Sequence, residues 1–322
     1  MPTSNVAAQN LERGHGGMNS AQDTAWERLA EEAAQLAAAF GKRRTDGGAE
    51  DRIAENLTEL TAALGADPGG TVVRRGALLR ILAGGCGRTA FALAERYAAA
   101  ARERATATGE RAGAVEGGTA TGERTAAAEG STTASEQAAA DGSPATGAAA
   151  RTAEDAADRA AEDAATRAAD HAEAAVLLGL AERAYRLAVA DLKERSAEAA
   201  SPAEAPALLP GTQFAVARMR AELASADALL AAYARAEDDP HTTTTRADSA
   251  VPRLRAGAVA EQVVSTAYEQ IRGGRQQTER RLSRIWQDVK SGPRPGYDAD
   301  TAWELVGKAA FGIDPTQTPR WL

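Results

Sequence analysis

Few side chains in this sequence have the types and spacing that chemistry requires. A metal site needs two or more His, Cys or carboxylate ligands at short intervals. His15, His171 and His241 are far apart, and none has a second ligand at such spacing. The single cysteine, Cys86, excludes an intrachain disulfide. We therefore expect neither a metal site nor a disulfide.

The charge balance limits the partners. The chain carries 37 basic and 45 acidic residues, a formal charge of −8, and no block of Lys or Arg interrupts the mixed charges. Phosphate backbones attract basic patches, so nucleic acid is not an expected partner. The N-terminus lacks an apolar signal core, and no apolar run approaches the ~20 residues of a membrane span. We expect a cytoplasmic protein that binds neither nucleic acid nor membrane.

Large apolar residues show where a core can form. Apolar residues make up 44% of the sequence, but most are alanine, and aromatic residues make up only 4%. Burying one methyl group contributes roughly 0.8 kcal/mol, whereas fixing one residue's backbone costs about 1–2 kcal/mol. Only the clusters of Leu, Val, Ile and aromatic residues can therefore make a core.

Helical periodicity marks an N-terminal helical region at residues 20–104. Ser20 and Asp23 have the spacing of a capping box, and large apolar residues then recur at helical intervals. The polar, glycine-bearing residues 1–19 are expected to form a disordered tail. The expected helices of this region span residues 20–40, 53–64 and 72–102.

Residues 105–171 contain almost no large apolar side chain. Up to Pro144 the composition is Thr, Gly, Ala, Glu and Ser, which is typical of a disordered linker. Between Thr152 and Asp170 the octet AEDAADRA is followed at once by AEDAATRA, a duplication rich in helix formers. We expect this second part to be a solvated helix, continuous with the helix that follows.

Residues 172–322 have the better cores. No stretch alternates with a period of two for long enough to predict a sheet. The expected fold is therefore all-α, with an N-terminal helical region, an Ala-rich linker and a C-terminal up-down bundle. The expected helices of the bundle span residues 176–200, 214–236, 251–271, 282–290 and 300–311.

Several motifs resemble the acyl-CoA dehydrogenase superfamily, which also includes flavin-dependent monooxygenases. The stretches ENLTELTAALGA (55–66) and LLRILAGGCGRTAFALAERY (78–97) resemble its N-terminal helical domain. The C-terminal match has more motifs, and they follow the family's order. They are VLLGLAERAYRLAVADL (176–192), TQFAVARMRAELASADALL (212–230), QIRGG (270–274), RLSRIWQDV (281–289) and ELVGKAAFGIDPTQTPRWL (304–322).

The resemblance implies a C-terminal four-helix bundle, assembly into dimers or tetramers, and a Gln-Ile-x-Gly-Gly turn that touches the FAD of a neighbouring subunit. Glycines let a backbone approach a pyrophosphate closely, and a glutamine amide can donate to its oxygens. Gln270, Gly273 and Gly274 are therefore the candidate cofactor-binding residues. The alternative is that the two glycines only end a helix.

The sequence departs from the family at the positions that carry chemistry. Gln287 stands where the family's Arg-Asp pair has its arginine, so Asp288 remains alone. Residues 291–300 lack the glutamate of the dehydrogenases, and the histidine of the monooxygenases is absent as well. Tyr297 and Asp298 are expected to be loop and cap residues. We therefore nominate no catalytic residue.

In the family a β-domain that holds the flavin ring and the thioester lies between the two helical parts, and here that region is alanine-rich. Three hypotheses follow. The chain is an acyl-CoA dehydrogenase-like oxidoreductase acting on CH–CH groups, degenerate, with impaired or absent catalysis. Alternatively it is a non-catalytic oligomerisation or partner-binding protein, as a homo-oligomer or as a hetero-oligomer that lends its glycine turn to a full-length dehydrogenase. The third is a divergent reading frame without a selected role.

Overall fold

The chain is all-α throughout the part that the structure describes, as predicted. The computed structural model describes residues 20–43, 49–64, 71–122, 144–291 and 298–315, and no strand occurs among them. The helices, with one short 3-10 turn labelled η2, are α2 (Ser20–Arg43), α3 (Ala49–Leu64), α4 (Val72–Ala83), α5 (Gly87–Gly122), α6 (Pro144–Glu198), η2 (Pro206–Leu208), α7 (Pro210–Asp238), α8 (Arg246–Ile271), α9 (Gln276–Ser291) and α10 (Ala299–Ala310).

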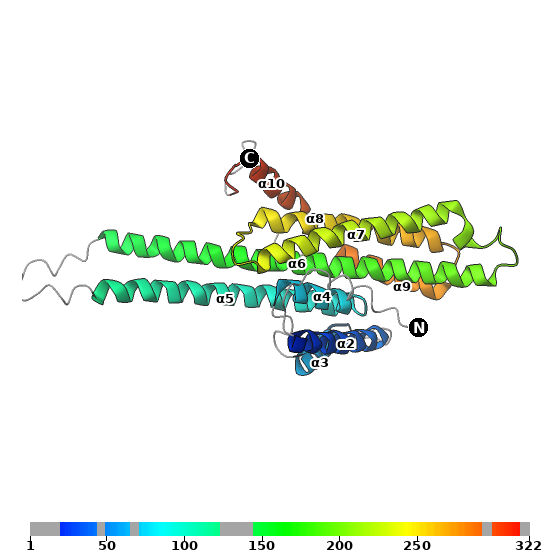
Figure 1. Cartoon of the computed structure of the whole chain (residues 1–322), viewed down its shortest axis with the longest axis horizontal. Helices are drawn as coiled ribbons and strands as arrows, with labels where there is room; N and C mark the ends of the chain where they lie inside the picture. Colours follow the sequence, from blue (N-terminus) through cyan, green and yellow to red (C-terminus); the bar gives the residue numbers. More distant parts are fainter. Residues whose placement is uncertain (1–19, 44–48, 65–70, 123–143, 292–297, 316–322) are drawn as a thin grey trace, which may run out of the picture.

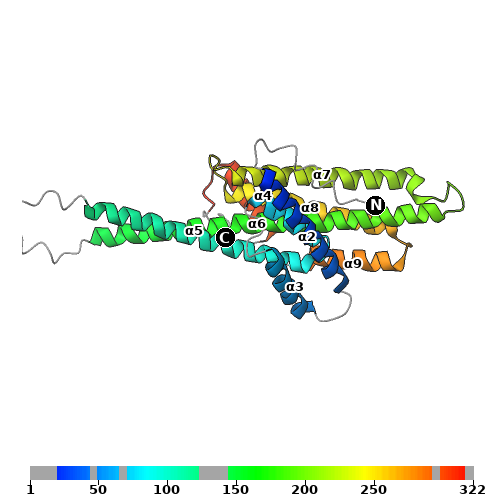
Figure 2. The ribbon, with the colours of Figure 1, turned by 60° about the horizontal axis from the view of Figure 1, so that its bottom comes forward.

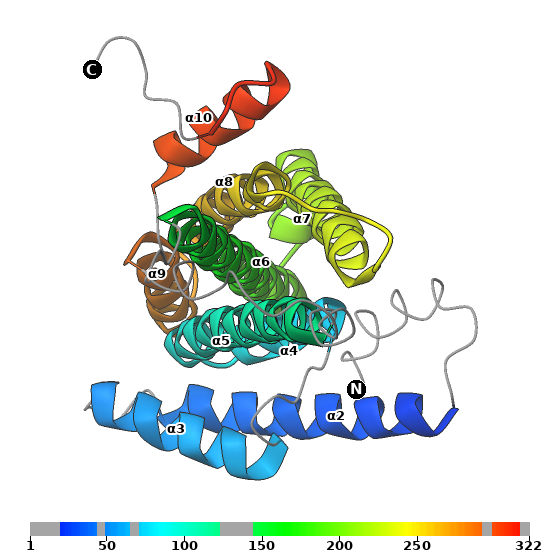
Figure 3. The same ribbon diagram turned by 90° about the vertical axis from the view of Figure 1, so that its left-hand side faces the viewer.

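Helix α6 is the axis of the molecule. Viewed from one end it lies between α4 and α5 on one side and α7 and α8 on the other, with α9 beside it (Figure 3). Every residue from Asp170 to Ala181 is buried. A helix that is buried on all sides has neighbours on all sides. The second half of α6 therefore forms the centre of the C-terminal bundle.

The N-terminal helices add a separate layer. In the end-on view α2 and α3 lie beneath α4 and α5, on the side away from α7 and α8 (Figure 3). Phe40 of α2 and Leu60 of α3 are each 1% exposed and belong to the same core as Leu79 of α4. These are the large apolar residues whose spacing predicted helices in this region.

Helices α5 and α6 form a long hairpin that projects beyond the other helices (Figures 1 and 2). Helix α5 continues through residues 105–122, so the prediction of a disordered linker is wrong for that stretch. Gly and Thr are frequent there, so helix propensity alone does not account for the helix; α5 packs along α6. The duplicated octets lie within α6, as predicted. The expected tail at 1–19 and residues 123–143 lie outside the described residues, and the domain boundaries at 104 and 171 stay predictions.

The helix predicted over residues 72–102 is in fact two helices, α4 and α5. The chain breaks at Gly84 and Gly85, where the N–H of Cys86 donates to the Leu82 carbonyl at 2.8 Å. A Cβ on Gly85 would overlap the backbone of Ala37 in α2, so the turn passes against that helix more closely than any side chain allows. Here a glycine within the helical pattern of apolar residues marks a close contact with another helix. The pattern alone does not reveal that contact.

The predicted C-terminal helices are all present, with shifted ends. Helix α8 begins at Arg246 instead of residue 251, because Thr245 and Asp248 form a capping box at its start. Asp298 caps α10 by accepting from the N–H of Thr301 at 2.8 Å, as expected, whereas Tyr297 lies outside the described residues. Among the described residues, no helix is both long and apolar enough to cross a membrane.

A close helix contact joins α4 to α6 at Gly179. A Cβ at this position would lie 2.6 Å from the carbonyl oxygen of Arg80 and 2.8 Å from the Cβ of Ala83. The Arg80 guanidinium then pairs with Glu182 of α6 and Asp227 of α7. Burial alone would lower the pKa of Arg80, but the two carboxylates raise it. The small residue allows the approach, and the ion pairs fix three helices around it.

We predict that Gly179→Ala destabilises the protein by about 1–3 kcal/mol, because the added methyl group must push α4 away from α6. The matched control is Gly257→Ala in α8, where a Cβ meets no atom within 4 Å. That change is expected to stabilise by about 0.5–1 kcal/mol through helix propensity. Urea unfolding followed by circular dichroism measures both. Equal midpoints for the two variants would contradict the close contact.

Candidate functional site

The predicted cofactor-binding residues lie where α8 turns into α9. Gly273 has a φ of 76°, in the left-handed region that favours glycine. Its N–H donates to Oε1 of Glu279 at 3.1 Å, and the N–H of Gly274 donates to the Ile271 carbonyl at 2.7 Å. The carbonyl of Gln270 accepts from Nη2 of Arg195 in α6 at 3.0 Å. The turn is thus hydrogen-bonded within the chain at all three positions.

Ion pairs surround this turn. A Cβ on Gly274 would lie 2.9 Å from Oδ2 of Asp191, a buried carboxylate that pairs with Arg195. The nearby Arg275 pairs with two glutamates of α6. A diphosphate needs available N–H donors and cations. Here the N–H groups of Gly273 and Gly274 already donate to acceptors of the chain, whereas Arg272 of the turn is exposed. Contact of the turn with FAD stays a prediction.

Asp288, the remaining member of the Arg-Asp pair, has a structural position. It is 3% exposed, and a Cβ on Gly87 would lie 3.0 Å from its Oδ2, so the carboxylate lies against the first residue of α5. A negative charge is favourable at a helix N-terminus. Arg88 of α5 approaches Oδ1 at 3.9 Å, whereas Gln287 is exposed. The aspartate therefore connects α9 to α5.

A buried ion network joins α6 to α8. Nε of Arg253 lies 2.8 Å from Oε2 of Glu173 and 3.7 Å from Oδ1 of Asp170. All three residues are buried, and Oγ of Ser249 donates to Oδ2 of Asp170 at 2.7 Å. A charge that leaves water needs a partner of opposite sign and further hydrogen bonds. The network supplies both across the interface of the two helices.

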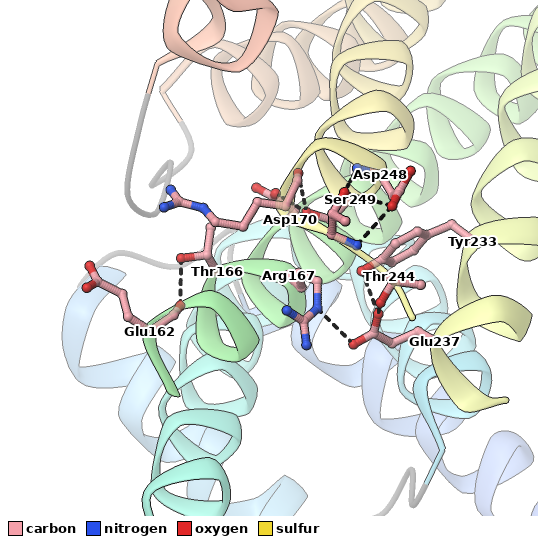
Figure 4. Close-up of polar contacts among 11 residues, drawn as sticks. Glu162, Thr166, Arg167, Asp170, Tyr233, Glu237, Thr244, Asp248 and Ser249 are labelled. Atoms are coloured by element: carbon pink, nitrogen blue, oxygen red, sulfur yellow. Dashed lines mark hydrogen bonds and ion pairs between the residues drawn. The ribbon is translucent and has the colours of Figure 1, made fainter. Parts of the chain in front are cut away.

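A second carboxylate cluster lies beside this network, at the end of α7 (Figure 4). Glu237 accepts from Nε of Arg167 at 3.2 Å, from the hydroxyl of Tyr233 at 3.0 Å, and from the hydroxyl of Thr244. Burial and the adjacent carboxylate raise the pKa of Tyr233 above its ordinary value. The cluster holds the α7–α8 connection against α6.

His171 is buried next to these groups. Its ring lies 6.1 Å from the Tyr233 ring, centroid to centroid, and fills the space left by Gly76 of α4, where a Cβ would be 2.6 Å from Cε1. Burial, and to a smaller extent the Arg75 cation, lowers the pKa of His171 from 6.5 to about 4. The ring is therefore uncharged at neutral pH. His241 is exposed, and His15 lies outside the described residues.

The second half of α6 and the helices that follow it correspond to a known domain. The family of acyl-CoA dehydrogenase C-terminal domains matches residues 171–311. The chain carries an acyl-CoA dehydrogenase C-terminal domain. This confirms the resemblance found in the C-terminal motifs, whereas the resemblance of the N-terminal helices stays a prediction. His171 and Glu173 lie in the first turn of the dehydrogenase domain, whereas Arg253 and the glycine turn lie further along it.

One solved structure resembles part of the chain. It is XiaF from Streptomyces sp. in complex with FADH2 and glycerol, with 22% sequence identity and a TM-score of 0.36. The likeness covers 49% of this chain and 42% of that chain, so less than half of either protein is compared. No curated protein matches the sequence.

Sequence reasoning missed the polar groups at the start of this dehydrogenase domain. Residues 152–170 were interpreted as a solvated helix, which is right as far as Ala160 but wrong near Asp170, where the helix is buried. The available signal was the placement of Asp170, His171 and Glu173 directly before a continuous apolar run. Ionisable residues on several faces of a buried helix require partners from other helices.

We predict that Arg253→Met destabilises the protein by about 3–5 kcal/mol, because it leaves two buried carboxylates without their cation. The control is Arg255→Met on the same helix, whose ion pair with Glu222 is partly exposed and should cost about 0–1 kcal/mol. Chemical unfolding of both variants measures the difference. A similar unfolding midpoint for the two would contradict the role of the buried network.

Proposed function

We propose that this chain is an acyl-CoA dehydrogenase-like protein, from the flavin-dependent oxidoreductases acting on CH–CH groups, that has impaired or absent catalysis of its own. Its C-terminal bundle serves as an oligomerisation or partner-binding module. The partner is a second copy of the chain or a full-length dehydrogenase.

The observation that carries this proposal is the direct pairing of α5 with α6. The family places its flavin-holding β-domain between the two helical parts. Here α5 runs out to Gly122, α6 begins at Pro144, and the two helices pack along each other. The residues of this hairpin at 105–122 and 144–168 are mostly small or charged. In a flavoenzyme the protein supplies binding and orientation for the cofactor's chemistry, and the described residues offer no strand for that task.

The glycine turn supports the same proposal. Its N–H groups donate to Glu279 and to the Ile271 carbonyl, and Asp191 lies against it. These contacts satisfy the turn within its own chain. They favour a structural role for Gly273 and Gly274 in joining α8 to α9 when the chain is alone. Lending the turn to a partner's flavin would require Glu279 to release the Gly273 N–H.

An apolar face on α10 supports a role in assembly. Trp303, Gly307 and Phe311 follow one another at intervals of four, so they lie on one face of the helix. Trp303 is 62% exposed and Phe311 is 82% exposed, whereas the neighbouring Ala302 is buried. Two exposed aromatic side chains with a glycine between them form an apolar surface that a partner helix can cover.

We expect the purified full-length chain to be colourless and to leave added FAD unbound. The reason is that the turn's donors are engaged. Visible absorption spectra before and after gel filtration with excess FAD measure retention, and dye reduction by an acyl-CoA substrate measures activity. A full-length acyl-CoA dehydrogenase treated in parallel is the positive control. A yellow protein that retains FAD and reduces the dye would overturn the loss of catalysis.

We expect the chain to be a dimer or larger at micromolar concentration, as measured by light scattering. The double variant Trp303→Glu/Phe311→Glu places charges on the α10 face and should weaken self-association at least tenfold. The matched control is Phe214→Glu, which alters a residue that is 74% exposed on α7 and should leave assembly unchanged. A strictly monomeric wild type that also fails to bind a full-length dehydrogenase would contradict the assembly role.

A further inference from the structure

Three arginines form an exposed basic surface on α9, which we call the arginine face. They are Arg280, Arg281 and Arg284, and all three are exposed. Residues three and four apart are neighbours on a helix, so Arg284 lies beside both of the others. Within the described part of the chain, none of their side chains makes an ion pair or a hydrogen bond. Like charges this close repel each other, so the arginine face is less favourable alone than against carboxylates.

The first half of α6 carries carboxylates with the same spacing, which we call the acidic stripe. Glu154, Asp155 and Asp158 repeat the intervals of the three arginines, and Glu162 extends the stripe by one turn. All four are exposed, and their carboxylates pair with no cation among the described residues. The one basic residue between Glu154 and Glu162 is Arg159, so the stripe stays acidic. Two helices can therefore place one set of charges opposite the other.

The two surfaces are too far apart to pair within one chain. The last turns of α9 lie near Leu180 of α6, because a Cβ on Gly87 would meet both Leu180 and Asp288. From Leu180 to Glu162 the helix extends roughly 27 Å, at about 1.5 Å per residue. An ion pair needs its nitrogen and oxygen within about 4 Å of each other. The hairpin end of α6 also extends away from α9 (Figure 1). Each surface therefore needs a partner from outside its own chain.

We propose that the arginine face of α9 binds the acidic stripe of a second copy of this chain. The inference rests on the assembly role proposed above and names the charged surfaces that select the partner. In a pair of copies related by a twofold axis, each chain supplies one arginine face and one acidic stripe, so two identical contacts form. Complementary charges of this kind determine which surfaces meet and in which orientation.

The test is a charge swap in the full-length chain, with dimer dissociation constants measured by analytical ultracentrifugation. Arg280→Glu/Arg284→Glu places like charges opposite each other and should weaken self-association at least tenfold. Glu154→Arg/Asp158→Arg should do the same from the other surface. An equal mixture of the two variants should restore the wild-type affinity. The reason is that each mixed pair contains one wild-type contact and one contact in which both charges are reversed.

Matched controls reverse exposed charges elsewhere that have no partner among the described residues. They are Arg218→Glu/Arg220→Glu on α7 and Glu31→Arg/Glu32→Arg on α2, and both should leave self-association unchanged. Circular dichroism checks that every variant keeps its helices. Added salt should weaken the self-association of the wild type, because ions screen exposed charges.

The outcomes separate this inference from the assembly role on which it rests. A wild-type dimer that neither reversal weakens, or a mixture that stays as weak as its two components, would refute the charge pairing and leave the assembly role intact. A wild type that binds neither itself nor a full-length dehydrogenase would contradict both. If Arg280→Glu/Arg284→Glu abolishes binding of a full-length dehydrogenase but not self-association, the partner of the arginine face is that dehydrogenase, and pairing with a second copy is wrong.

Discussion

The close approach of α4 to α6 at Gly179 is the constraint on which the rest of the structure depends. A side chain there would overlap the α4 backbone, so only glycine lets the N-terminal helices reach the axis of the C-terminal bundle. Once α4 is in place, Arg80 pairs with α6 and α7 together. The break after α4 then directs α5 along α6. Packing at one glycine thus decides how the two helical parts of the chain combine.

The buried charges help to select this arrangement of the helices. Apolar contacts between helices rich in alanine are small and similar, so they discriminate weakly between neighbouring registers. Arg253 meets Glu173 and Asp170 in only one register of α8 on α6, and Glu237 meets Arg167 in only one position of α7. Unpaired buried charges would penalise the alternatives by several kcal/mol. We infer that these ion pairs specify the arrangement that the small apolar residues permit.

Two regions of the molecule differ in their polar contacts. At one end of the bundle the glycine turn is closed by its own carboxylates and carbonyls, which is consistent with a connection between helices. Near the start of the dehydrogenase domain, Ala164, Arg167 and His171 of α6 line a cavity beside α5.

The sequence alone determined the helices, because periodicity, capping residues and helix formers act within a few residues of one another. It predicted every helix of the C-terminal bundle, the cap at Asp298 and the family of the domain. Only the tertiary structure decided the break at Gly85, the continuation of α5 past residue 104, and the burial of Asp170, His171 and Arg253. These depend on contacts between segments far apart in the chain, such as Gly85 with Ala37 or Arg253 with Glu173. A local pattern carries no information on which distant helix provides the partner.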